Sequence, residues 1–160
     1  MSGGTRKSNV CLFVMIFDEE SRLDMDLLVA KSLLPGAGMG LFASRDFMEG
    51  ETICRYESPL GTLTTKEAMQ LEDKSFLMRL GPQKYIDLKN FPEVKARYIN
   101  DCRQADRHNV RFQKKPDDGY ADVIATRVIH SGEELYVDYG RLYWFGSKTL
   151  PSKLAVRSED

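Results

Sequence analysis

The apolar positions of the chain fall into short runs rather than into long helical stripes. Each run is rich in β-branched or aromatic side chains and is bounded by Gly, Pro, Asn or Asp. Such runs favour short strands. A mostly β fold is therefore expected, and doubly wound α/β folds are disfavoured because they need helices that alternate with strands. The expected strands cover residues 27–34, 52–56, 85–88, 110–113, 121–129 and 134–137.

One segment between these strands favours a helix. Thr64 is followed three residues later by Glu67, which is the pattern of a capping box at the start of a helix. Apolar residues follow at helical spacing, and a Gly-Pro pair would end the helix. The expected apolar face comprises Met69, Phe76, Leu77 and Leu80, and the expected end is Gly81-Pro82.

The longest uninterrupted apolar run covers residues 10–17. Its eight residues are too few to cross a bilayer, which needs roughly 20. Arg6 and Lys7 precede the run as in a signal peptide, but acidic residues 18–20 stand where the small residues of a cleavage site would lie. We interpret the run as a buried strand or a docking segment, and we expect neither secretion nor a membrane partner.

The composition is that of a soluble globular domain. Of the 160 residues, 42% are hydrophobic and 29% are charged, which allows one domain with an ordinary core. The formal net charge of −1 disfavours a general polyanion binder. The three cysteines, Cys11, Cys54 and Cys102, lie too far apart for a zinc or redox pair, and their odd number argues against a secreted disulfide framework. We expect an intracellular protein without a metal site.

Four short motifs stand out by their order and spacing. They are 35–43 (PGAGMGLFA), 50–53 (GETI), 97–100 (RYIN) and 132–140 (GEELYVDYG). Each alone is weak: the glycine stretch could be a bare turn, and no helix follows it as a dinucleotide loop would require. Together and in this order they resemble the SET-domain protein lysine methyltransferases, and the resemblance runs from about Leu28 to Trp144.

The resemblance implies a fold of small curled β-sheets with an inserted helix. It also implies a C-terminal pseudoknot, in which the C-terminal stretch passes through a loop formed by the asparagine motif. On this basis the chain divides into an N-terminal extension (1–27), a SET domain (28–145) and a C-terminal tail (146–160). No cysteine cluster follows Gly140, so a zinc-binding extension is not expected, and residues 141–145 would close the substrate channel.

Methyl transfer from a sulfonium to lysine requires the neutral amine. Free lysine has a pKa of about 10.4, so only about 0.1% is neutral near pH 7.4. A narrow aromatic channel and the positive charge of the cofactor both lower the pKa of the lysine. A tyrosine hydroxyl can then orient the lone pair along the line of attack. By resemblance, Tyr139 is this catalytic tyrosine.

The resemblance also names residues of the lysine channel. Tyr56 and Tyr143 stand where the family places channel aromatics, although each also fits ordinary packing. Val137 occupies the position where the family usually has Phe or Tyr, which limits the number of methyl groups, so we expect a second or third methyl to fit. Trp144 either lines the channel or stacks on the adenine of the cofactor, and the sequence leaves this choice open.

The implied cofactor is S-adenosyl-L-methionine. The asparagine motif departs from the family pattern, Asn-His-Ser-Cys-x-Pro-Asn, because Asp101 replaces the histidine and Asn109 follows Asn100 by nine residues instead of six. His108 could reach back into the vacated position or could simply be solvated. The expected cofactor-binding residues are Ala37, Gly38, Met39, Gly40, Asn100, Asp101, Tyr139 and Trp144.

Three functions from different classes follow. The first is a protein lysine N-methyltransferase that acts on a lysine-containing protein, with a histone tail as the leading substrate, a nuclear or chromatin-associated location, and homodimer formation left open. The second is a catalytically degenerate SET fold kept as a binding module, which Asp101 and the lengthened loop favour. The third is a small β-domain that binds nucleic acid through Arg111, Lys114 and Lys115 near Phe112. Such a run is more typical of a solvated strand edge, and direct nucleic-acid binding is not expected.

Overall fold

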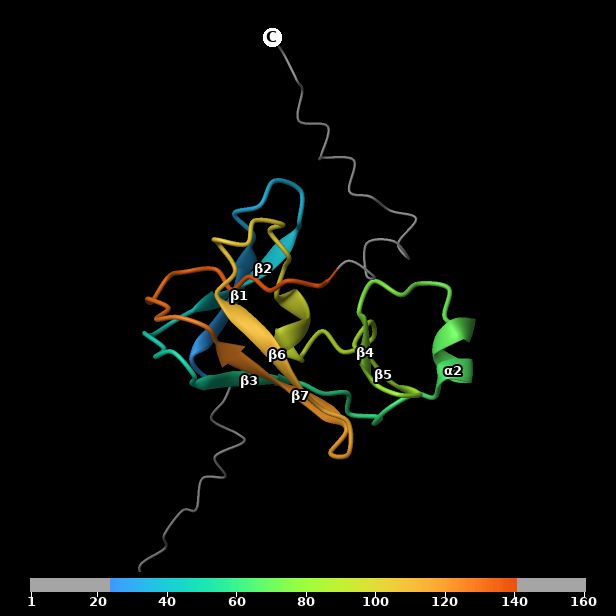
Figure 1. Cartoon of the computed structure of the whole chain (residues 1–160). Coiled ribbons are helices and arrows are strands. Elements are labelled where there is room, and N and C mark those ends of the chain that lie inside the picture. The colour runs from blue at the N-terminus through green and yellow to red at the C-terminus, as the bar shows by residue number, and fades with distance from the viewer. Residues whose placement is uncertain (1–23, 141–160) are drawn as a thin grey trace, which may run out of the picture.

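The computed structural model describes residues 24–140, which form three small antiparallel sheets (Figure 1). This arrangement confirms the expected mostly β fold. The first sheet pairs β1 (Leu27–Lys31) with β2 (Met39–Ala43). The second has the order β3-β7-β6 and consists of β3 (Thr52–Tyr56), β7 (Tyr120–Ala125) and β6 (Val110–Lys115). The third pairs β4 (Leu77–Gly81) with β5 (Lys84–Asp87).

The sheets share one apolar core, whose largest fully buried side chains include Leu41, Phe47 and Ile99. The short 3₁₀ helix η1 (Lys95–Tyr98) packs against β1, β2 and β3. Strand β7 lies between β3 and β6, and its residues 121–125 are all buried. This central position explains why the run of apolar residues there is nearly continuous.

A buried carboxylate stands among the apolar residues of β7. The side chain of Asp122 is only 7% exposed, and it contacts Arg55 at 3.2 Å and Lys115 at 2.7 Å. Paired cations of this kind reduce the cost of removing a carboxylate from water. Lys115, one of the three basic residues of the nucleic-acid hypothesis, is thus paired with a carboxylate of its own sheet.

The helix expected at Thr64 is much shorter than predicted. Helix α2 (Thr65–Gln70) begins with the predicted capping box, in which Thr64 and Glu67 bond reciprocally. It ends at Leu71, and it has no apolar face, because Met69 is 54% exposed and only Ala68 is buried. The prediction that Phe76, Leu77 and Leu80 continue this helix is wrong.

Residues 77–81 form β4 because they pair with β5 and bury Leu80 in the core. Before this strand, the Asp73 carboxylate accepts hydrogen bonds from the backbone N–H and the hydroxyl of Ser75 (2.9 and 2.5 Å). Local bonds of this type compete with helical ones. Pairing with a neighbouring strand has therefore overridden an apolar spacing that also fits a helix.

The last motif lies between two distant parts of the chain. Leu135 donates its backbone N–H to the Leu41 carbonyl in β2 (2.8 Å), and Val137 donates to the Asn100 carbonyl (3.0 Å). Instead of the expected strand over 134–137, these residues form isolated bridges to Phe42 and Asn100. Contacts on both sides of the stretch are those expected of the pseudoknot.

Several expectations fall outside the described residues. They concern the apolar run 10–17, Tyr143, Trp144 and the closure of the channel by 141–145. The division into 1–27, 28–145 and 146–160 stays a prediction. Between residues 24 and 140, no helix is long and apolar enough for a membrane span.

Candidate active site

The glycine-rich stretch forms an exposed turn between β1 and β2. Ser32 donates its backbone N–H to the Gly38 carbonyl (2.8 Å) and so closes the turn. Gly38 has a φ of 76°, in the left-handed region that favours glycine. A Cβ at Gly38 would meet no atom within 4 Å, and residues 35–39 are all exposed. The turn therefore offers backbone groups to a ligand at an open surface.

A buried carboxylate holds this turn in place. Glu134 is 3% exposed, and its two oxygens accept four hydrogen bonds. The donors are the Ser32 hydroxyl (2.6 Å), the Leu33 N–H (2.8 Å), the Asn100 amide (3.3 Å) and the Tyr136 hydroxyl (2.8 Å). Burial, followed by the bond to Glu134, raises the pKa of the Tyr136 hydroxyl, so this group stays a donor.

The sequence motif 132–140 contains Glu134, but no structural or binding role was predicted for this residue. The available signal was a carboxylate immediately before the apolar residues 135–137, since a charged group in such a position needs partners if it is buried. The turn approaches this carboxylate closely. A Cβ at Gly40 would lie 2.1 Å from Glu134 Oε1, so only glycine fits at position 40.

Asn100 joins the turn to the C-terminal motif. Its side-chain amide donates to the Met39 carbonyl (3.0 Å) and to Glu134, while its backbone carbonyl accepts the N–H of Val137. Asn109, the second asparagine, is 1% exposed and bonds through its side chain to the backbone of Glu134 and Tyr136. The structure thus brings Met39, Gly40 and Asn100 together, as expected for a shared ligand site.

Asp101 takes part in the same assembly. Its side chain is 3% exposed, and Oδ1 accepts the backbone N–H of Arg103 (2.7 Å) and lies 3.1 Å from His108 Nε2. Oδ2 accepts the backbone N–H of Tyr139 (3.1 Å). Of the two alternatives for His108, the structure does not show the solvated one, because the imidazole lies against Asp101 and its side chain is 17% exposed.

We expect Asp101 and His108 to stabilise the chain as a coupled pair. Asp101→Asn and His108→Ala should each lower the free energy of unfolding by about 1–2 kcal/mol. The double variant should lose about 1 kcal/mol less than the sum, because the contact can be lost only once. Urea unfolding of the four proteins measures this coupling, and strictly additive losses would contradict it.

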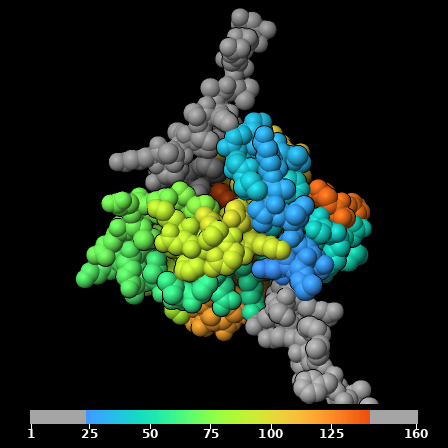
Figure 2. All heavy atoms as spheres, turned by 180° about the vertical axis from the view of Figure 1, so that it is seen from behind, coloured from blue at the N-terminus to red at the C-terminus, as the bar shows by residue number. Residues whose placement is uncertain are grey.

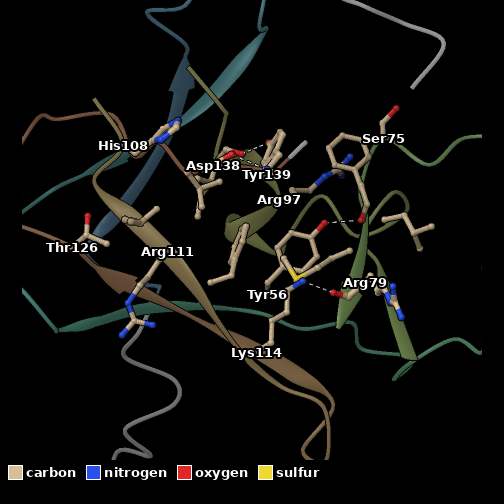
Figure 3. Close-up of a pocket in the computed structure, with 18 of the residues that line it drawn as sticks. Tyr56, Ser75, Arg79, Arg97, His108, Arg111, Lys114, Thr126, Asp138 and Tyr139 are labelled. Carbon is tan, nitrogen blue, oxygen red and sulfur yellow. Dashed lines mark hydrogen bonds between the residues drawn. The ribbon is translucent and has the colours of Figure 1, made fainter. Parts of the chain in front are cut away.

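Tyr139 lies where this assembly meets a cavity. Its hydroxyl donates a hydrogen bond to the Ile99 carbonyl, and its backbone is held by Asp101. The cavity has a volume of about 800 Å³ and is lined by Tyr139 together with Tyr56, Val137 and Phe76 (Figure 3). The end of the described chain lies in a recess between residues 24–50 and 75–100 (Figure 2).

The cavity walls are rich in aromatic rings. Tyr56 donates its hydroxyl proton to the Phe76 carbonyl (2.6 Å), and its ring meets that of Phe112 edge to face, with centroids 5.6 Å apart. Sequence reasoning placed Phe76 in the helix, so its part in the cavity was missed. A wall of this kind disfavours a protonated amine, because it replaces water by apolar surface.

The structure separates the predicted site residues into two neighbouring groups. Tyr56, Val137 and Tyr139 line the cavity. Ala37, Gly38, Met39, Gly40, Asn100 and Asp101 do not line it, and they form the adjoining turn and loop. Asp101 links the groups through its bond to the backbone of Tyr139.

Comparison with known proteins identifies the class. Residues 38–140 match the sequence profile of the SET domain, and the chain belongs to the SET domain family. Similar proteins include N-lysine methyltransferase KMT5A-A of Xenopus laevis and N-lysine methyltransferase KMT5A of Xenopus tropicalis, each 26% identical over 138 residues. KMT5A-B of Xenopus laevis is 27% identical over 131 residues.

These alignments cover 76–77% of this chain but only 37–41% of the Xenopus proteins. The chain therefore spans about two fifths of the length of the curated relatives it matches. The similarity supports a shared domain, and it confirms the resemblance drawn from the four motifs.

Proposed function

We propose that the chain is an S-adenosyl-L-methionine-dependent protein lysine N-methyltransferase, with a histone or another chromatin-associated protein as substrate and a nuclear location. The observation that carries this proposal is the position of Tyr139. It borders an aromatic cavity and is tied through Asp101 to the loop that contacts the glycine turn. The names of the relatives support the same reaction.

SET domains generally use S-adenosyl-L-methionine, and the glycine turn fits such a ligand. The open space at Gly38 and the exposed backbone of 37–39 leave room for it. We assign Ala37, Gly38, Met39, Gly40, Asn100 and Asp101 to its binding. When bound, the cofactor supplies an electrophilic methyl group on a sulfonium.

The cavity would favour the neutral form of the substrate amine. Tyr56, Phe76 and Val137 surround the lysine side chain with largely apolar atoms, which favours the neutral amine over the ammonium. The Tyr139 hydroxyl donates its proton to the Ile99 carbonyl, so its oxygen acts as an acceptor toward a further donor. An amine N–H held there has its lone pair directed away from the phenol.

The size of residue 137 bears on the number of methyl groups transferred. Val137 is 2% exposed and lines the cavity beside Tyr139. Valine leaves space that an aromatic ring would fill. We therefore expect the chain to transfer a second or third methyl group to its substrate lysine. Spectra that contain only monomethyl-lysine on every accepted substrate would contradict this assignment.

Two measurements test the function. S-adenosylhomocysteine at about 100 times its Kd should add about 2.7 kcal/mol to the free energy of unfolding, seen as a higher Tm. Mass spectrometry of a reaction with core histones and cofactor should show added mass on lysine in units of one methyl group. Stabilisation without any transfer would favour the catalytically degenerate binding module, and the absence of both would contradict the proposed function.

A further inference from the structure

Four basic residues line the cavity beside its aromatic wall. Arg79 belongs to β4, Arg97 to η1, and Arg111 and Lys114 to β6. Three of them, Arg79, Arg111 and Lys114, are exposed. In Figure 3, Lys114 lies below Tyr56, Arg111 to the left of it and Arg79 to the right. None of the four had a role in the reaction proposed from the sequence.

These cations have no carboxylate partner within residues 24–140. Lys114 donates to the Arg79 carbonyl (2.5 Å), and Arg111 contacts only the Gln113 amide oxygen. Arg97 stacks over the ring of Phe76 at 4.1 Å, and its buried Nε has no hydrogen-bond partner in this part of the chain. Burial, and then the charge of Arg79, lower the pKa of Lys114, as expected where positive charges gather.

Several basic residues elsewhere in the domain do have carboxylate partners. Arg45, Arg55, Lys115 and Arg127 all pair with carboxylates, at 2.6 to 3.2 Å. At the cavity, the one described carboxylate in the lining is that of Asp138, which accepts the N–H of Gly140. The cavity wall therefore has an excess of positive charge.

A positive wall acts on a peptide substrate in two ways. It disfavours the protonated form of the target lysine, and it attracts negative charge near that lysine. An extended peptide advances about 3.3 Å per residue. Residues one to three positions from the lysine then lie within about 10 Å of it, within reach of long side chains on β4 and β6.

We propose that this wall selects lysines that have acidic residues next to them in sequence. The inference rests on the proposed function, and it narrows the substrate class: among chromatin proteins, acidic segments are preferred over the basic segments of histone tails. Arg79, Arg111 and Lys114 make the electrostatic contacts at the rim, and Arg97 extends the positive charge inward.

Binding of two labelled peptides tests the preference directly. Both are 11 residues long with one central lysine, and they differ only in having Asp and Glu or Arg and Lys at the flanking positions. With S-adenosylhomocysteine present, fluorescence anisotropy at low salt should show at least tenfold tighter binding of the acidic peptide. The difference should shrink as salt is added. Equal binding, or tighter binding of the basic peptide, would overturn the inference.

Variants at the rim of the cavity show which residues cause the preference for the acidic peptide. Arg79→Gln and Lys114→Gln should each reduce the preference severalfold, whereas Lys66→Gln, which removes the same charge from an exposed position outside the cavity lining, should not. A preference unchanged in both rim variants would count against the assigned contacts.

Methyl transfer to the same two peptides separates this inference from the proposed function. Tight binding of the acidic peptide without transfer would support the charge preference and count against the enzyme. Transfer to the basic peptide with the lower KM would support the enzyme and overturn the preference. Transfer to the acidic peptide with the lower KM supports both.

Discussion

Replacement of Tyr139 by Phe should lower kcat for methyl transfer about 100-fold while the Kd for S-adenosylhomocysteine changes little. The phenol oxygen would be lost as the acceptor that orients the amine, but the ring would still fill its place beside Val137 and Ile99. The backbone bond from Tyr139 to Asp101 does not involve the hydroxyl and should persist. Single-turnover rates and calorimetric binding measure the two quantities separately.

Tyr98→Phe is the matched control for this experiment. The Tyr98 hydroxyl also donates to a backbone carbonyl, that of Pro92 (3.0 Å), and it does not line the cavity. Both variants lose one bond from a phenol to a carbonyl, so any general effect on stability should be similar. Full activity of Tyr139→Phe, or an equal loss in Tyr98→Phe, would remove the catalytic role from Tyr139.

Gly40→Ala should lower the free energy of unfolding by about 2–3 kcal/mol and weaken cofactor binding as well. The new Cβ would stand 2.1 Å from Glu134 Oε1 and 3.3 Å from the Cα of Ser32. The Glu134 carboxylate would have to move away from its hydrogen-bond donors, and those buried donors would then lose their acceptor. Denaturant unfolding and S-adenosylhomocysteine binding measure the two effects.

Two comparisons show whether the contact with Glu134 is the cause. In a Glu134→Ala background the obstructing carboxylate is absent, so Gly40→Ala should cost far less than in the natural chain. Gly61→Ala is a control for backbone strain: Gly61 has a φ of 79° and open space at its Cβ position, so the expected loss is about 1 kcal/mol. The same cost for Gly40→Ala in both backgrounds would contradict the steric explanation.

The sequence predicted the parts of the site that depend on local chemistry. The glycine-rich stretch predicted a tight turn, and Gly38 in that turn has the left-handed conformation that favours glycine. Tyr56, Val137 and Tyr139, which the resemblance assigns to the lysine channel, line the same cavity. Their roles in that channel stay a prediction.

The parts that failed depend on partners that the local spacing of apolar residues does not reveal. Leu77 and Leu80 suit a helix or a strand by spacing alone, and the pairing with β5 decides for the strand. The role of Glu134 follows from donors such as the Ser32 hydroxyl, 102 residues away. The charge of the cavity wall likewise arises only where β4, η1 and β6 meet.

The connectivity of Glu134 also affects how the domain folds. Its bonds join residues separated by 102, 101 and 34 positions, and contacts of such range are slow to form because a long loop must first close. Until the segment around Glu134 has docked, the turn at 35–39 lacks the bonds that Ser32 and Leu33 make to this carboxylate. We therefore expect affinity for S-adenosylhomocysteine to appear late in refolding, after the hairpin of β4 and β5, which closes between neighbours in the chain.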